Sequence, residues 1–95
     1  MIDNDSLERS ELVRTILTYC VMYPDAKDTV EGILEWWLPK PLASVGRDEI
    51  ARILDALATL GWLIKRQLAR SGAVYGVNKT ALQEIITFLT AANER

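Results

Sequence analysis

Histidine is absent from this 95-residue sequence, and cysteine occurs once. Without histidine the chain lacks the commonest metal ligand and the commonest general base. Cys20 has no second cysteine for an internal disulfide and no histidine to activate its thiol. Its apolar neighbours Ile16, Leu17 and Val21 indicate a thiol packed in the core. We therefore expect a protein that is not an enzyme and that binds no metal and no other cofactor.

Glycine is also scarce, because the chain has only five, and none stands in a GxGxxG or GxxxxGK arrangement that would cradle a phosphate. Two carboxylate pairs, Asp25 with Asp28 and Asp48 with Asp55, could in principle support acid-base chemistry. Each of these residues is explained equally well as a helix cap or as an exposed charge on a helix. The sequence therefore offers no nucleophile and base that could form a catalytic pocket.

Long hydrophobic runs are missing as well. No run approaches the roughly 18–20 apolar residues that span a bilayer, and the first residues are acidic and polar where a signal peptide would be basic and then apolar. We expect a cytoplasmic protein with no membrane partner. The composition, 49% apolar and 25% charged, is typical of globular proteins, and the length suits one domain over residues 1–95.

Apolar residues at helical spacing, together with a region of alternating and β-branched residues, predict a mainly α fold with a small β-hairpin. The expected helices cover about residues 6–22, 28–38, 46–60 and 79–92, and the hairpin covers about residues 62–77. The expected caps are Asp5 with Glu8 for the first helix, Asp28 to Glu31 for the second, Ser44 for the third and Asn78 or Thr80 for the last.

The third helix has the clearest pattern. Its buried stripe is predicted to consist of Ile50, Ile53, Leu54, Leu57 and Leu60. Gly61 follows where a helix commonly ends in a left-handed residue. The opposite face carries Asp48, Arg52, Asp55 and Thr59. Asp48 is expected to pair with Arg52 at i, i+4.

The second and last helices raise three further expectations. Gly32 lies inside the second helix, where it costs up to about 1 kcal/mol relative to alanine, so close approach of another backbone is one reason for it. Trp36 and Trp37 lie about 100° apart around the helix, and only Trp37 belongs to the apolar stripe. The stripe of the last helix is Leu82, Ile85, Ile86 and Leu89. It either covers its own core or pairs with the first helix of a second copy.

The segment Leu54–Leu63, with its pattern LxxLxxxGWL, resembles the junction between recognition helix and wing in winged helix-turn-helix domains. The segment Arg70–Asn78, RSGAVYGVN, resembles the turn and return strand of the wing. The resemblance implies a three-helix core, a two-stranded wing and an additional C-terminal helix. It also implies a DNA-binding function.

The charge distribution agrees with this expectation better than the net charge of −2 does. Residues 1–46 carry eight acidic and four basic side chains, whereas residues 47–79 carry six basic and three acidic ones. A positive field over the wing would attract phosphates. The candidate DNA-binding residues are Arg47, Arg52, Lys65, Arg66 and Arg70. Lys65 and Arg66 are neighbours in a strand and cannot face the same partner.

Two functions remain open from the sequence. The first is a dimeric winged-helix DNA-binding protein that regulates transcription, reads duplex DNA with the third helix and the wing, and dimerises through the first and last helices. The second is a winged-helix protein-protein interaction module that uses Trp36, the wing or the last helix. The acidic pI of about 5.0 and the two aspartates of the third helix favour the second.

Overall fold

The computed structural model describes residues 4–39, 46–68, 70 and 72–93, and the side chains of these except 4–10, 92 and 93. The protein is mainly helical and has a three-stranded antiparallel sheet with the strand order β1-β3-β2. In chain order the elements are α1 (Asn4–Met22), β1 (Lys27–Asp28), α2 (Val30–Gly32), η1 (Ile33–Trp37), α4 (Arg47–Leu60), β2 (Leu63–Leu68), β3 (Gly72–Val77), η2 (Lys79–Ala81) and α5 (Leu82–Asn93). The expected mainly α fold with a small hairpin is confirmed.

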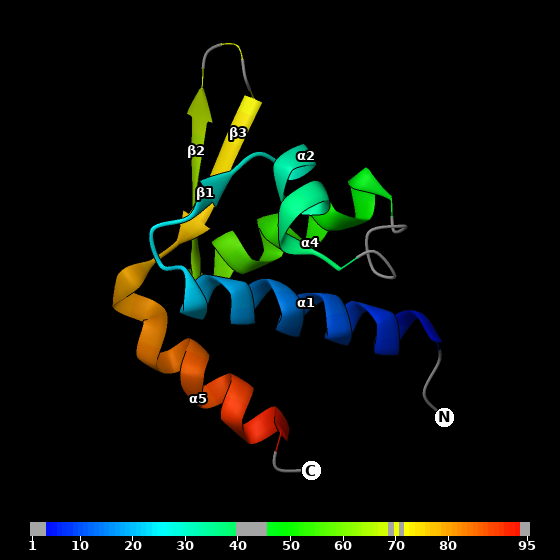
Figure 1. Ribbon diagram of the computed structural model, residues 1–95, viewed down its shortest axis with the longest axis vertical. Helices are drawn as coiled ribbons and strands as arrows, with labels where there is room; N and C mark the ends of the chain where they lie inside the picture. The colour runs from blue at the N-terminus through cyan, green and yellow to red at the C-terminus, as the bar shows by residue number, and fades with distance from the viewer. Residues whose placement is uncertain (1–3, 40–45, 69, 71, 94–95) are drawn as a thin grey trace.

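The helices form one layer around α1, and the hairpin projects from it. Figure 1 shows α1 between α5 on one side and α2 and α4 on the other, with β2 and β3 extending away from the helices. Helix α1 supplies much of the core, since Leu12, Ile16, Leu17 and Cys20 are buried. Burial raises the pKa of the Cys20 thiol to about 12, so the group is protonated at neutral pH.

The second helix differs most from the expectation. Lys27 and Asp28 do not enter it but form strand β1, in which they pair with Gly76 and Tyr75 of β3. The N-cap is Thr29, whose hydroxyl accepts a hydrogen bond from the Gly32 amide at 3.1 Å. The helix then continues as the π-helical turn η1. The second helix was predicted over residues 28–38, and its predicted start at Asp28 was wrong. Asp28 instead belongs to a short segment that pairs with the edge of the distant strand β3.

Gly32 is needed because the side chain of Asp28, and not another backbone, occupies the space beside it. A Cβ at this position would lie 1.8 Å from Oδ1 of Asp28, the atom that accepts a hydrogen bond from the Thr29 amide at 2.9 Å. The expected close approach of another backbone is thus corrected. Glycine leaves the space in which the Asp28 carboxylate holds the start of α2.

Helix α4 buries Ile50, Ile53, Leu54 and Leu57 as predicted, but Leu60 is 65% exposed. Leu60 lies in the last turn, which extends past the core, so its assignment to the buried stripe was wrong. Gly46 occupies the N-cap position without a side-chain cap, and the proposed cap Ser44 lies outside the described residues, as do the side chains of the Asp5 and Glu8 cap.

The end of α4 sets the direction of the hairpin. Gly61 has φ 90°, as expected, and its amide donates to the Ala58 carbonyl while the Trp62 amide donates to the Leu57 carbonyl, each at 3.0 Å. This is the Schellman arrangement. The Asn78 side-chain amide then donates to the Gly61 carbonyl at 2.8 Å. The end of α4 is thereby joined to the segment that leads from β3 into η2.

The last helix begins with a 3-10 turn, η2, whose N-cap Asn78 accepts from the Thr80 amide at 3.2 Å. This confirms Asn78 as the cap. In α5, Ile85 is buried against its own core, where α5 packs on α1. Ile86 was assigned to the same stripe, but its side chain is exposed. The stripe is narrower than predicted, because α5 contacts the remainder of the chain along one flank only.

Candidate nucleic-acid interface

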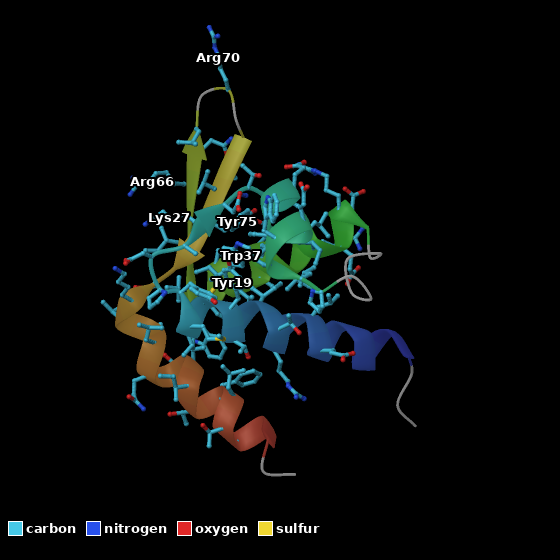
Figure 2. The ribbon with its side chains drawn as sticks, in the orientation of Figure 1. Tyr19, Lys27, Trp37, Arg66, Arg70 and Tyr75 are labelled. Atoms are coloured by element: carbon cyan, nitrogen blue, oxygen red, sulfur yellow. The ribbon has the colours of Figure 1, made fainter. Side chains whose placement is uncertain are left out.

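The β2–β3 hairpin has two chemically different faces. Directly opposed residues share a face, and the register pairs Lys65 with Tyr75 and Arg66 with Val74. The inner face, with Leu63, Lys65 and Tyr75, lies toward the helices. The outer face, with Arg66, lies away from them, and Figure 2 shows Arg66 and Tyr75 on opposite sides of the sheet. The prediction that Lys65 and Arg66 face different ways is confirmed.

Lys65 belongs to a small polar network between the hairpin and α4. Oδ1 of Asp55 accepts a hydrogen bond from the Tyr75 hydroxyl at 2.7 Å and another from Nζ of Lys65 at 3.0 Å. Nζ also lies 5.7 Å from the centre of the Tyr75 ring. Asp55 therefore has a structural role, which is to bind Tyr75 and Lys65. The sequence pattern of charges on the helix could not indicate these two contacts.

The network changes the pKa values of its members. The hydrogen bond from Tyr75, followed by that from Lys65, lowers the pKa of Asp55. The pKa of Tyr75 is raised, first by burial and then by the bond to Asp55. The hydrogen bond to Asp55 raises the pKa of Lys65. The charged form of Asp55 is thus the form that holds the hairpin to α4.

A lowered carboxyl pKa predicts a loss of stability in acid. The contribution of Asp55 is fully present above its ordinary pKa of about 4 and is lost as pH falls through the lowered folded value. Asp55→Asn should therefore flatten the dependence of the unfolding free energy on pH below about 5, by no more than about 1 kcal/mol, since the group is half-exposed. Urea unfolding from pH 2 to 7 measures this, with Asp48→Asn as the control on the same helix. Parallel curves for wild type and Asp55→Asn would contradict it.

The arginines of α4 already have partners. Nε of Arg47 forms a short hydrogen-bonded ion pair with Glu31, which joins the start of α4 to α2. Arg52 lies 3.7 Å from the Glu49 carboxylate. The expected pairing of Arg52 with Asp48 is therefore wrong, and the carboxylate three residues away is the partner. Both arginines are exposed, but neither presents an uncompensated charge.

Arg66 and Arg70 are different. Both are exposed, and neither forms an ion pair within the part of the chain that the structure describes. Figure 2 shows Arg70 at the hairpin tip, pointing away from the body of the molecule. Of the five predicted residues, Arg47, Arg52 and Lys65 thus form ion pairs with carboxylates of the chain. Arg66 and Arg70 on the hairpin form none within the described residues.

Lys27 is a further exposed cation that the sequence analysis did not select. In β1 it pairs with Gly76 and so joins the outer face of the sheet. The lysine side chain lies against that glycine, because a Cβ on Gly76 would stand 2.8 Å from Cγ of Lys27. Glycine in the middle of a predicted strand was the available signal for such a close approach.

An apolar groove of about 490 Å³ lies away from the hairpin, among α1, α4 and α5. Its walls include Leu60 and Phe88, both exposed, and Trp62, whose ring packs edge-on against Phe88 at 5.3 Å between centroids. Arg52 and Glu49 stand at its margin. The groove accounts for the exposure of Leu60, which lines it.

Comparison with known proteins gave no relative: no protein-family model, curated protein or solved structure matches the chain. Within the described residues, no helix is both long and apolar enough to cross a membrane, and no three histidine, cysteine or acidic side chains are grouped to hold a metal ion.

Proposed function

We propose that this chain is a winged helix-turn-helix protein that binds duplex DNA and regulates transcription, with the β2–β3 hairpin as its DNA-facing element. One observation supports the proposal most: the hairpin projects from the helical layer and carries Arg66 and Arg70, which form no ion pair with any residue that the structure describes. Unpaired arginines on a projecting ribbon suit phosphate contacts, since counterion release favours such binding. Catalysis has no part in this proposal.

DNA binding of this kind must depend on salt. A labelled mixed-sequence duplex titrated with protein at about 50–200 mM salt should show affinity that falls linearly on a log-log plot, with a slope of about −0.9 for each phosphate neutralised. Fluorescence anisotropy measures this directly. A slope equivalent to several phosphates is the expected result. The proposal fails if no binding occurs at about 50 mM salt, where electrostatic attraction is strongest.

The second candidate is a protein-protein interaction module of the same fold. The apolar groove, with Leu60 and Phe88 exposed in it, and Trp36, which is 69% exposed, favour this function. Helix α4 as a whole carries three acidic and two basic side chains, which disfavours phosphate contacts by the helix. Absence of DNA binding together with a protein partner covering the groove would select this alternative.

The proposal includes a homodimer. Its interface was expected to use α1 and the last helix, and the groove that these helices form with α4 is the apolar surface available to a second copy. Two copies would then read half-sites about one helical turn apart. Sedimentation equilibrium over a micromolar concentration range tests the association, and a single monomeric mass throughout would remove the dimer from the proposal.

A further inference from the structure

The outer face of the sheet lies away from the helices that the structure describes. Its residues follow from the register: Lys27, Gly76 and Ile64 stand in one row across the three strands, and Arg66 with Val74 stands in the next. Leu68 continues the face toward the hairpin tip. Ile64 and Leu68 are both exposed. This face therefore combines basic and apolar side chains.

The charge on this face has one sign. Lys27 and Arg66 lie on it, Arg70 lies at its tip, and none of the strand residues that the structure describes on this face is acidic. Two carboxylates lie close to Lys27 in sequence: Asp28 accepts a hydrogen bond from the Thr29 amide, and Asp25 forms a short ion pair with Lys79. None of the three cations forms an ion pair with a residue that the structure describes.

Gly76 fixes where the first of these cations lies. Because Gly76 has no side chain, the first carbons of the Lys27 side chain lie against β3, while the residue as a whole stays exposed. Lys27 and Arg66 belong to strands on either side of β3, which places them roughly 10 Å apart across the sheet. Arg70 lies four residues beyond Arg66. This spacing suits several phosphates of one DNA backbone, which recur every 3.4 Å of helix axis along each strand.

The exposed face of α4 has the opposite balance. The acidic side chains of α4 are Asp48, Glu49 and Asp55, and they outnumber its basic side chains, Arg47 and Arg52, which form ion pairs with Glu31 and Glu49. Phosphates approaching α4 would meet net negative charge. The charged strand residues that phosphates would meet on the outer face of the sheet, Lys27 and Arg66, are both basic.

We infer that the outer face of the sheet, through Lys27, Arg66 and Arg70, supplies the phosphate contacts to duplex DNA, and that the exposed face of α4 supplies none. The inference rests on the proposed DNA-binding function and names the surface responsible for it. Ile64 and Leu68, which lie between the cations, contact the walls of the DNA groove. An α4-centred orientation would turn this face away from the duplex.

The test compares salt dependence among single variants. Lys27→Ala, Arg66→Ala and Arg70→Ala should each weaken binding to a mixed-sequence duplex and reduce the slope by about 0.9. The triple variant should lose about 2.7 of the slope, so that raising salt from 50 to 200 mM weakens it about 40-fold less than wild type. Arg52→Ala removes the same charge from α4 and should leave the slope unchanged. Lys27→Arg should restore wild-type behaviour at β1, and thermal melts confirm that each variant is folded.

Each other outcome identifies what has failed. A slope reduced by Arg52→Ala but unaffected by Lys27→Ala and Arg66→Ala would overturn the inference while DNA binding stands. No binding of wild type to DNA would overturn both the inference and the proposed function.

Binding to vesicles that contain phosphatidylserine is measured as well, because a basic and apolar face also suits an anionic lipid surface. Binding to these vesicles without binding to DNA would assign the face to a membrane instead.

Discussion

Replacing Trp37 with alanine is expected to lower the free energy of unfolding by about 3–5 kcal/mol, the range for removing a buried tryptophan. The Trp37 side chain is only 5% exposed, and its ring stacks on Tyr19 with 4.6 Å between centroids and 13° between planes. Truncation would remove both the apolar burial and the aromatic contact that joins η1 to α1. Chemical denaturation followed by circular dichroism measures the change.

Trp36 is the matched control, because the same residue type stands next in the chain but is 69% exposed. Trp36→Ala should change the unfolding free energy by less than about 0.5 kcal/mol. Equal losses in the two variants would contradict the placement of the two rings. The same pair also serves the function: a loss of partner binding in Trp36→Ala, with stability unchanged, would support the interaction-module alternative.

Leu54→Ala should cost about 2–5 kcal/mol, because this side chain of α4 is fully buried and its removal leaves a cavity. A domain of this size shifts its melting temperature by about 4–8 °C per kcal/mol, so the midpoint should fall by at least about 8 °C. Differential scanning calorimetry gives the midpoint directly. DNA affinity at a temperature where the variant is folded should remain, since Leu54 reaches no exposed surface.

Leu60→Ala is the control on the same helix, with the same atoms removed from a side chain that is 65% exposed. Its effect on the midpoint should be small in the monomer. A large destabilisation by Leu60→Ala that grows with protein concentration would instead show that the groove is covered in an assembly. Similar losses from both leucine variants at low concentration would contradict the observed burial of α4.

Much of the fold was predictable because its signals are local. The buried residues Ile50, Ile53, Leu54 and Leu57 repeat at helical spacing, and Gly61 marks the end of the helix by its left-handed conformation. The placement of Lys65 and Arg66 on opposite faces of β2 was also predictable, because successive side chains of a strand alternate. In each case the residues that determine the conformation lie within a few positions of one another.

Strand β1 was not predictable in the same way. The segment Lys27–Asp28 is too short for a periodic pattern, and its partners Gly76 and Tyr75 lie almost fifty positions away. Local capping chemistry therefore suggested a helix start, and Thr29 does provide one a single residue later. The pairing of Lys27–Asp28 with β3 outweighed the local preference for a helix start at Asp28, which is worth only about one hydrogen bond.

The candidate site was also predictable only where its signals are local. The sequence identified Arg47, Arg52, Lys65, Arg66 and Arg70 as a basic group. Which of these charges is compensated depends on Glu31, Glu49 and Asp55, of which only Glu49 could be recognised as a neighbour by helical spacing. Lys27 joined the group only through its pairing with β3.

The sequence by itself determined the helices, the hairpin and the basic character of the region that contains α4 and β2, because periodicity, glycine positions and charge are properties of neighbouring residues. Only the tertiary structure decided that Lys65 is bound to Asp55, that Arg47 is bound to Glu31, and that Lys27 shares a face with Arg66. Ion pairs and strand pairing act across space between residues far apart in the chain, and their geometry exists only once the core has folded.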